Sequence, residues 1–459
     1  MNQLLKSALA LSALTLAACD SDNSTSPIVE VPATPTLSVQ VLHASPDAPK
    51  VNVLVNGAAV LEGVDYREGS GRLELDAGTY NVAVEGILPG GNATVIGPVD
   101  LPLAGDSIYS IVAVGDVTTI EPVIVQQPRT PVSAGSARLT VLHATAAAPA
   151  VDVYVTAPGG SLSGIAPVGS FEFKGTIGPA EVAAGDYQIR VTPAGDASTI
   201  VFDSGTVSLT DGADLFLAAV PNTVGAATLA RPASPISLAV LTGTGATGIF
   251  DVGTPSWVRV FHKSPDAPAV DVIVNDNADL PLVEDLAFTQ FAGFVPVAAD
   301  DYNVKVTAAN NIGAVVIDAN LSLAVGEAYD VLAVGPLAAI EPLVLNDDPR
   351  VVNTYAKVRI VHASPTAQDV DIYVTAPGTD IGTVEPARAA VPFKANTGYL
   401  ELAPGSYDVT VTPTGSKTAA IGPATLSFEA GDVLTVVARD EAGGGTPLNV
   451  VITNDALQP

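Results

Sequence analysis

The sequence predicts an all-β protein built from four tandem antiparallel β-sandwich domains, preceded by a leader and a tether. Three observations predict this class. Aliphatic residues dominate the 459-residue chain, which is 48% hydrophobic and 5% aromatic, and its 41 glycines and 36 prolines indicate many turns. One short motif recurs four times along the chain. Apolar and polar residues alternate with a period of two, which is typical of half-buried strands, and no stretch keeps a helical period.

The first nineteen residues, MNQLLKSALALSALTLAAC, have the pattern of a bacterial export signal. Lys6 supplies a positive charge, and the apolar run after it is too short to span a membrane stably. The ending LAAC, which closes on Cys19, resembles the lipobox of bacterial lipoproteins. That resemblance implies that residues 1–18 are cleaved off and that Cys19 is lipidated with a diacylglycerol and an acyl chain. The alternative is an ordinary signal peptide with a chance cysteine, although Cys19 is the only cysteine in the chain.

The remaining chain divides by composition. Residues 19–36 are polar and contain prolines, so we expect the lipidated Cys19 to be followed by a flexible tether. Proline- and glycine-containing stretches predict linkers at 126–136, 230–256 and 346–355. The four sandwich repeats are therefore expected at 37–126, 137–230, 256–346 and 356–456.

The recurring motif shows how the repeats arose. Its four copies are VLHASPDAPKVNVLVN, VLHATAAAPAVDVYVT, VFHKSPDAPAVDVIVN and IVHASPTAQDVDIYVT. Copies one and three share SPDAP and form type A, whereas copies two and four share YVTAP and form type B. His262 follows His43 by 219 positions, and His362 follows His143 by the same 219. One fixed offset indicates that an ancestral two-domain unit was duplicated.

The motif begins in a strand and turns sharply. Val39, Val41 and His43 share one face of that strand, and Gln40 and Leu42 share the other. We therefore expect one buried face on each strand and turns every 8 to 12 residues, as in a sandwich.

A tyrosine provides a second landmark in every copy, within strings such as DAGTYNVAV and APGSYDVTV. This pattern resembles the corner tyrosine of immunoglobulin-like sandwiches, whose hydroxyl bonds back to the chain, and it makes the predicted domains immunoglobulin-like. The alternative is an ordinary half-buried strand tyrosine. The candidates are Tyr80, Tyr187, Tyr302 and Tyr407.

The string H-A-S-P-D-A-P-x-V-(D/N)-V-x-V-N is similar to the signature of the bacterial family called domain of unknown function 4397. The likeness is fullest in copies one and three. Copy two departs from it, with Thr145, Ala146 and Ala147 in place of Ser-Pro-Asp, and copy four has Thr366 and Gln368. The resemblance implies an exported, often lipid-anchored, β-rich envelope module, and it implies no activity.

Three roles were weighed for the motif histidines, which are His43, His143, His262 and His362. An imidazole at the end of a core-facing strand can donate to a turn carbonyl and accept from a turn amide, and this structural role is the one we expect. A metal site needs three or four convergent ligands, whereas each copy offers one histidine. Calcium at the acidic loop of Asp276 and Asp279 is the other form of metal binding that the sequence leaves open. Catalysis needs a nucleophile against the ring, and no G-x-S-x-G elbow is present.

The net charge of the chain limits which partners it can bind. The net charge of −29 repels phosphate backbones, so we expect no nucleic-acid partner. We also expect no cofactor, no metal and no enzymatic activity. The membrane would be reached through the lipid on Cys19. Location at the outer membrane, at the periplasmic face of the inner membrane or at the cell surface stays open.

The function that follows is a non-enzymatic, lipid-anchored cell-envelope protein, an adhesion or scaffold rod with an envelope, matrix or glycan partner. Four domains in line would reach about 150 Å. The alternative is a periplasmic binding module for a small ligand or cation, such as a glycan or calcium. An enzyme with a cleft near 230–256 is a third class, but that stretch has no paired carboxylates and no nucleophile.

Overall fold

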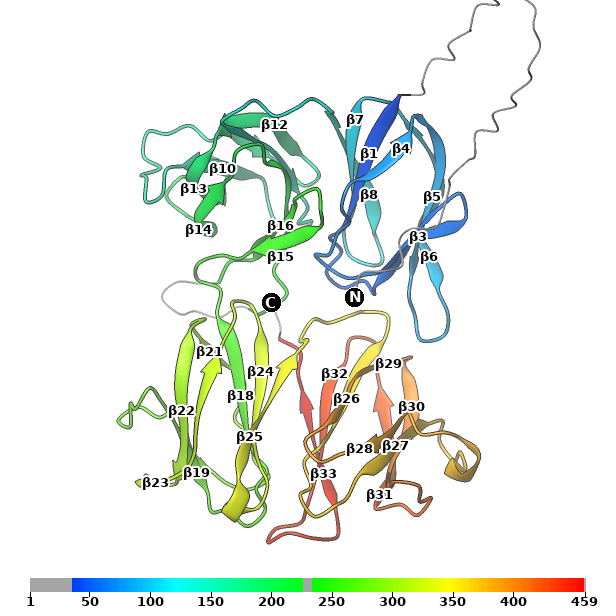
Figure 1. Ribbon diagram of the computed structural model, residues 1–459, viewed down its shortest axis with the longest axis vertical. Helices are drawn as coiled ribbons and strands as arrows, with labels where there is room; N and C mark the ends of the chain where they lie inside the picture. The colour runs from blue at the N-terminus through cyan, green and yellow to red at the C-terminus, as the bar shows by residue number, and fades with distance from the viewer. Residues whose placement is uncertain (1–34, 226–232, 458–459) are drawn as a thin grey trace, which may run out of the picture. The chain divides into compact units, whose positions relative to one another are not determined.

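A computed structural model describes residues 35–225 and 233–457, and from Pro35 onward they form one compact unit (Figure 1). Nearly all regular structure in them is β-strand, with two short 3-10 helices, η1 (Leu337–Ala339) and η2 (Ile381–Thr383). Within these ranges no helix has the length and apolar character needed to cross a membrane. The predicted signal peptide, Cys19 and most of the tether lie outside the described residues.

The strands fall into four successive repeats, which follow the colour bar of Figure 1 from blue to red. Repeat 1 contains β1 (Thr36–His43), β2 (Val51–Val55), β3 (Ala58–Val64), β4 (Leu73–Asp76), β5 (Gly78–Gly86), β6 (Ala93–Leu103), β7 (Ser107–Val114) and β8 (Glu121–Pro128). Repeat 2 contains β9 (Ser136–His143), β10 (Val151–Thr156), β11 (Gly169–Phe171), β12 (Thr176–Ala183), β13 (Gly185–Pro193), β14 (Phe202–Leu209), β15 (Asp214–Pro221), β16 (Ile236–Leu241) and β17 (Ala246–Ile249). Repeat 3 contains β18 (Ser256–His262), β19 (Val270–Val274), β20 (Val283–Leu286), β21 (Val295–Val297), β22 (Asp301–Ala308), β23 (Asn311–Ser322), β24 (Ala328–Val334) and β25 (Glu341–Asp347). Repeat 4 contains β26 (Ala356–His362), β27 (Val370–Thr375), β28 (Arg388–Val391), β29 (Asn396–Leu402), β30 (Gly405–Pro413), β31 (Ile421–Phe428), β32 (Val433–Arg439) and β33 (Asn449–Asn454).

Each repeat is a sandwich of two sheets with one shared strand order. In repeat 1 the first sheet runs β4-β1-β7-β8 and the second runs β3-β2-β5-β6, and repeats 2, 3 and 4 reproduce both orders. The prediction of an all-β chain of four tandem β-sandwiches is confirmed. Repeat 2 differs only by β17, which adds a fifth strand beside β16.

The sheets are not purely antiparallel. The first strand of each repeat pairs parallel with the seventh, as β1 does with β7, and all other pairs are antiparallel. A parallel pair needs a long connection, and here β2 to β6 supply it. The resulting order also differs from the ABED and CFG sheets of constant-type immunoglobulin domains, although the sandwich architecture is shared.

Both faces of the first sheet are buried, for different reasons. Leu37 and Val39 of β1 face the core between the two sheets of repeat 1. On the opposite face Leu42 packs against Leu142 and Phe216 of repeat 2. Repeats 3 and 4 pack in the same way, through Phe261, Leu332, Val361 and Val437. The duplicated unit is therefore a pair of sandwiches joined through their first sheets.

The expected in-line rod is wrong, because contacts also join one pair to the other. Arg350, in the segment between repeats 3 and 4, donates through Nη1 to the Ala48 carbonyl of repeat 1 at 2.8 Å. The Trp257 indole of repeat 3 donates to the Val224 carbonyl of repeat 2 at 2.5 Å. Within each pair, the apolar outer faces of the first sheets also pack against each other instead of facing water, so the two sandwiches of a pair are held by these faces.

The stretch 230–256, expected to be a linker, belongs largely to repeat 2. β16 completes its first sheet, and every residue from Ile236 to Leu241 is buried. A turn then leads to β17, where Thr242 N donates to the Gly245 carbonyl at 2.9 Å. Repeat 2 therefore extends to Ile249. The expected linker at 346–355 is also packed, since Val352 and Tyr355 are buried.

Candidate functional site

The first motif histidine is held by the turn that follows it. His43 lies at the end of β1 with its Nε2 atom 3.0 Å from the Pro49 carbonyl oxygen, so Nε2 carries the proton and donates. Its Nδ1 atom accepts from the backbone N–H of Ser45 at 3.3 Å. Both ring nitrogens are therefore committed to backbone groups, and the ring joins the strand to its turn.

The other three histidines have the same geometry. Each Nε2 lies 2.8–3.2 Å from the carbonyl six residues later, and each Nδ1 accepts at 3.3 Å from the amide two residues later. The acceptors are the carbonyls of Pro149, Pro268 and Gln368, and the donors are the amides of Thr145, Ser264 and Ser364. The contacts use backbone atoms, which explains why copies two and four keep them despite their altered turn sequences.

Burial keeps these rings neutral. It lowers the pKa of His43 to about 4, although the hydrogen bond to Pro49 opposes the shift. Burial also lowers the pKa of the other three motif histidines below the usual value. A neutral ring with both nitrogens bonded has no free site for proton transfer or metal ligation.

The adjacent serines are not arranged as nucleophiles. Ser45 and Ser264 contact their histidine through the backbone amide, and their Oγ atoms are buried with no hydrogen-bond partner in the described part of the chain. The Ser364 hydroxyl bonds Asp440 instead. A nucleophile needs its oxygen hydrogen-bonded to the base, so this arrangement has no activated hydroxyl.

An aromatic side chain, which the sequence analysis missed, packs edge-on against each histidine. In repeat 1 it is Tyr66, with ring centroids 6.4 Å apart. The next residue, Arg67, has φ 65° and donates its amide to the His43 carbonyl at 2.8 Å. The aromatic partners in the other repeats are Phe171 and Phe173, Phe288, and Phe393. The sequence signal is an aromatic residue followed by Arg, Lys or Thr, 23 to 31 positions after the histidine.

The landmark tyrosines also bond to the backbone. Each hydroxyl donates to the carbonyl four residues upstream, at 2.8–2.9 Å. The pairs are Tyr80 with Asp76, Tyr187 with Ala183, Tyr302 with Ala298, and Tyr407 with Ala403. Each tyrosine lies where the chain passes from the first sheet to the second, so its bond closes that corner.

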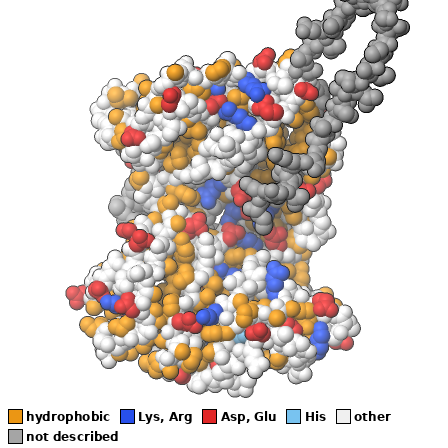
Figure 2. Space-filling view, viewed as in Figure 1, with side chains coloured by type: hydrophobic (Ala, Val, Ile, Leu, Met, Phe, Trp, Pro, Cys, Tyr) orange, Lys and Arg blue, Asp and Glu red, His pale blue; other side chains and the backbone are white. Residues whose placement is uncertain are grey.

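The acidic surface shows no built metal site. In residues 35–225 and 233–457, no group of three or more His, Cys, Asp or Glu side chains could hold a metal ion. Asp276, a candidate calcium ligand, pairs with Lys305, and Asp279 is exposed. Acidic side chains are scattered over the face shown in Figure 2 and form no continuous patch there.

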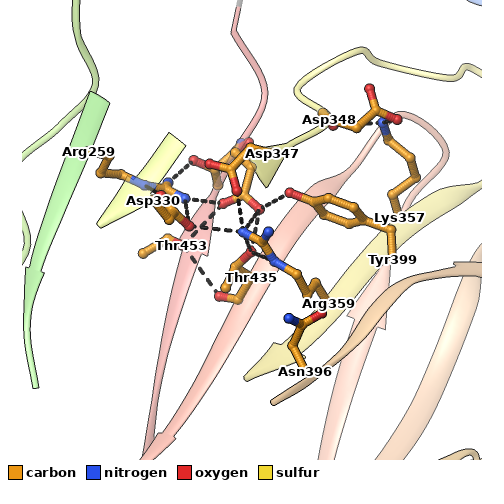
Figure 3. Close-up of polar contacts among 12 residues, drawn as sticks. Arg259, Asp330, Asp347, Asp348, Lys357, Arg359, Asn396, Tyr399, Thr435 and Thr453 are labelled. Atoms are coloured by element: carbon orange, nitrogen blue, oxygen red, sulfur yellow. Dashed lines mark hydrogen bonds and ion pairs between the residues drawn. The ribbon is translucent and has the colours of Figure 1, made fainter. Parts of the chain in front are cut away.

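A cluster of charged side chains is buried between repeats 3 and 4 (Figure 3). Arg259 donates from Nε and Nη2 to both oxygens of Asp330, at 2.7 and 2.9 Å, and from Nη2 to Asp455 at 2.5 Å. Arg359 donates from Nη2 to Asp330 at 2.9 Å and to Asp347 in a short ion pair at 2.5 Å. All five side chains are at most 5% exposed. The two guanidinium groups therefore share three carboxylates away from water.

The protonation of this cluster follows from burial. Burial and the neighbouring Asp330 and Asp455 carboxylates raise the pKa of Asp347 to about 8, although Arg359 opposes the rise. Burial also raises the pKa of Asp330, although Arg259 opposes that rise. This cluster was not predicted from the sequence. Two features of the sequence mark it in repeats 3 and 4. An arginine precedes each motif histidine by three positions, and an Asn-Asp pair stands at the end of the last strand of each repeat.

The first pair has uncharged side chains at four of these five positions, those of Arg259, Arg359, Asp330 and Asp347. Gln40 stands where repeat 3 has Arg259, and it donates to the Ser110 hydroxyl at 2.8 Å. Thr140 stands where repeat 4 has Arg359, and it donates to Gln127 at 2.7 Å. The two halves of the duplicated chain therefore differ in charge at the interface between their sandwiches.

One polar cavity of about 340 Å³ is lined by residues of all four repeats. Its charged lining includes Asp65, Arg67, Glu327 and Arg350. Arg350 forms an ion pair with Asp65, and Glu327 accepts from Asn346 at 3.2 Å. Much of the charge on this wall is therefore already paired within the protein.

Comparison with known proteins gives a family and no curated relative. The model of the family described as Domain of unknown function (DUF4397) matches residues 37–154, 256–373 and 356–459, and these ranges include all four motif histidines. No curated protein matches the chain.

Three solved structures resemble parts of the chain. The Bacillus anthracis TIE protein is 11% identical, with 89% of this chain and 68% of that chain covered and a TM-score of 0.15. A family CBM26 module of Eubacterium rectale Amy13K, in complex with maltoheptaose, is 11% identical over 42% of this chain and 96% of its own, with a TM-score of 0.16. The pneumococcal glycogen-degrading virulence factor SpuA is 9% identical over 62% of this chain and 37% of its own, with a TM-score of 0.15. TM-scores of this size support no inference about ligand or activity.

Proposed function

Because the chain belongs to the family described as Domain of unknown function (DUF4397), as tandem repeats, we propose that it is a non-enzymatic, lipid-anchored protein of the bacterial cell envelope. Its four sandwiches act as a structural and interaction scaffold, presenting loops and strand edges to an envelope, matrix or glycan partner. No nucleic acid takes part, because the chain carries a net charge of −29.

One observation carries this proposal. Both ring nitrogens of all four motif histidines form hydrogen bonds with backbone groups of the fold. A catalytic or metal-binding histidine needs a free nitrogen facing a substrate, a nucleophile or an ion. The motif therefore stabilises each sandwich. The binding function belongs to the surface that the four assembled sandwiches present.

The anchor rests on the sequence of the first residues. LAAC resembles a lipobox, Cys19 is the only cysteine, and the polar stretch after it gives the folded unit a tether. The acyl chains on Cys19 hold the protein to a membrane.

Metabolic labelling with palmitate tests the anchor. We expect the wild-type chain to incorporate label and to sediment with membranes, and Cys19→Ala to lose both properties. Ser24→Ala is the matched control, since it changes the tether and leaves both the leader and the lipid-accepting thiol in place. An unlabelled wild-type protein in the soluble fraction would contradict the anchor.

Protease shaving of intact cells, with parallel separation of inner and outer membranes, tests where the scaffold is displayed. Loss of the mature chain from intact cells places it on the surface and directs the search to matrix and adhesion partners. Protection until the outer membrane is broken places it in the periplasm. Recovery of intact chain in the cytosol under both conditions would contradict an envelope role.

The polar cavity favours a second function, capture of a small polar ligand or cation in the periplasm. It has room for a small molecule, at about 340 Å³, and its wall carries both charge signs. A ligand that binds only the folded state raises the melting temperature in a saturable way. A melting temperature that does not change across calcium and a panel of glycans would exclude this function.

A further inference from the structure

The first sheet of repeats 1, 3 and 4 ends in an edge strand, and in repeat 2 the equivalent strand is covered by β17. These strands are β8, β25 and β33 in repeats 1, 3 and 4, and β16 in repeat 2. A bare edge presents unpaired N–H and C=O groups that can pair with another chain. The comparison among the repeats shows which edge is protected and which is not.

Repeats 1 and 3 protect the edge with a proline. Pro122 of β8 pairs with Ala113, and Pro342 of β25 pairs with Ala333 at the equivalent position. A proline has no N–H, so these are positions where the backbone groups point away from the neighbouring strand, toward the edge. An added strand would find one donor missing near the start of β8 or β25.

Repeat 2 covers the edge with its own chain. It has Leu238 at the proline position, and Leu238 pairs with Ile249 of β17. Val240, two residues further along β16, is then only 3% exposed. The equivalent side chains are 40% exposed for Ile124, 42% for Val344 and 40% for Ile452. An added antiparallel strand therefore closes the open side of this sandwich, and repeat 2 shows that the edge accepts one.

Repeat 4 has neither protection. Val450 of β33 pairs with Ala438 at the proline position, and it retains its N–H. In the described residues β33 pairs with β32 alone. The stretch from Thr446 to Asn454 also contains no charged residue, in a chain with a net charge of −29. Charged side chains, which protect many natural edges, are thus missing here as well.

We propose that the β33 edge is a docking surface for β33 of a second copy of this chain. The two strands pair antiparallel about a twofold axis and join the first sheets of two repeat-4 sandwiches into one continuous sheet. The contact is isologous, so the same residues serve on both sides.

The register follows from which backbone groups are free. Because the Val450 groups point outward, so do those of Ile452 and Asn454, two and four residues on. The Asn454 carbonyl already accepts from Arg259 Nη1 at 2.9 Å. Val450 and Ile452 remain, and each can exchange two hydrogen bonds with the other in the second copy. This arrangement puts the twofold axis at Val451.

Self-pairing suits these side chains. Val450 of one copy lies opposite Ile452 of the other, and Val451 lies opposite Val451, so every central pair is β-branched. Two strongly acidic molecules repel each other, and this uncharged edge lets them meet without placing like charges opposite each other.

Disulfide trapping tests the contact in the full chain. In a Cys19→Ala background, Val451→Cys provides the only thiol. Residues directly opposite in a non-hydrogen-bonded antiparallel pair have Cα atoms about 4.5 Å apart, which a disulfide can bridge. Val123→Cys, at the same position on the proline-protected β8, is the matched control. We expect most of the Val451→Cys chain to run as a covalent dimer under mild oxidation, and at least about tenfold less of the Val123→Cys chain. Equal trapping of both variants, trapping of neither, or trapping of a different protein would overturn the proposal.

A second variant keeps the test independent of thiol chemistry. Val450→Pro transfers the proline of repeats 1 and 3 to β33 and removes an N–H that the sandwich itself does not use. We expect sedimentation in mild detergent to give a dimer for the wild-type chain and a monomer for Val450→Pro, with an unchanged melting temperature. A wild-type monomer at all concentrations, or a dimer that Val450→Pro leaves intact, would refute self-association through β33.

Discussion

The Arg259 guanidinium of repeat 3 donates to the Asp455 carboxylate of repeat 4, with 2.5 Å between Nη2 and Oδ1. The two side chains are 1% and 0% exposed. Arg359 and Asp347 make the reciprocal contact from repeat 4 to repeat 3. Desolvation offsets most of the attraction in a buried ion pair, but loss of one partner leaves a buried charge without compensation. The second pair of sandwiches therefore depends on these residues more than the first pair depends on its neutral counterparts.

Replacing one arginine tests that difference. Arg259→Leu removes one of the two cations that face the three buried carboxylates, and we predict a loss of about 3–5 kcal/mol in the free energy of unfolding of the second pair. Gln40→Leu, at the equivalent position in the first pair, removes a neutral hydrogen bond to Ser110 and should cost about 1–2 kcal/mol. Scanning calorimetry of both variants measures the difference. A cost for Arg259→Leu no greater than that of Gln40→Leu would contradict it.

The pH dependence of stability should reveal the proton on Asp347. Its pKa is about 8 in the folded chain, against about 3.9 for an unfolded aspartate. The folded state holds this proton more tightly, so the contribution of Asp347 is complete below pH 4 and is lost as the pH rises through 8.

Asp347→Gln isolates this contribution, because it installs the side chain that repeat 1 has at the equivalent position. The wild-type curve alone is not sufficient, since burial lowers the pKa of Lys263 to about 7 and that group acts in the opposite direction. We predict that the stability of Asp347→Gln relative to wild type rises steadily from pH 5 to pH 8. Denaturant unfolding at each pH checks this, and a difference that is independent of pH would refute a raised pKa.

Arg350 should couple the two pairs of sandwiches. It bonds two carbonyls of repeat 1, those of Pro46 and Ala48, and it pairs with Asp65. We predict that Arg350→Ala costs about 2 kcal/mol and separates one calorimetric transition into two. Arg129→Ala is the control, because the Arg129–Glu74 pair is exposed and should contribute well under 1 kcal/mol. A single transition in Arg350→Ala would show that other contacts couple the pairs.

Sequence periodicity was sufficient to predict the strands and the repeats, because a strand with one buried face leaves a period of two. It placed Val39 on the core side of β1 correctly. It could not predict that Leu42, on the other side, packs against a second sandwich. One apolar residue on an outer face is common in proteins, so only the folded neighbour distinguishes an interface from a surface.

The strand from Ile236 to Leu241 was predicted to be part of a linker for a related reason. Ile236 to Leu241 is buried on both faces, and such a strand appears as a short apolar run without alternation. The glycines that follow, at Gly243 and Gly245, suggested a linker but belong to the turn into β17. The charged cluster was missed because its members are far apart in sequence and meet only when repeats 3 and 4 pack together.

The measurement that tests the central claim most directly is a pH titration of the four histidine rings by NMR, followed with His→Gln variants for assignment. The claim is that the repeated histidine holds the fold and performs no chemistry. Since burial lowers the pKa of all four rings, their contribution to stability is complete above pH 6.5 and is lost at lower pH, and for His43 the loss extends down to about pH 4. The account predicts that no ring titrates near pH 6.5 and that His43 takes up its proton only near pH 4. A motif histidine that titrates between about pH 6 and 7 in the folded protein would have an accessible nitrogen, and it would contradict the structural role assigned to the motif.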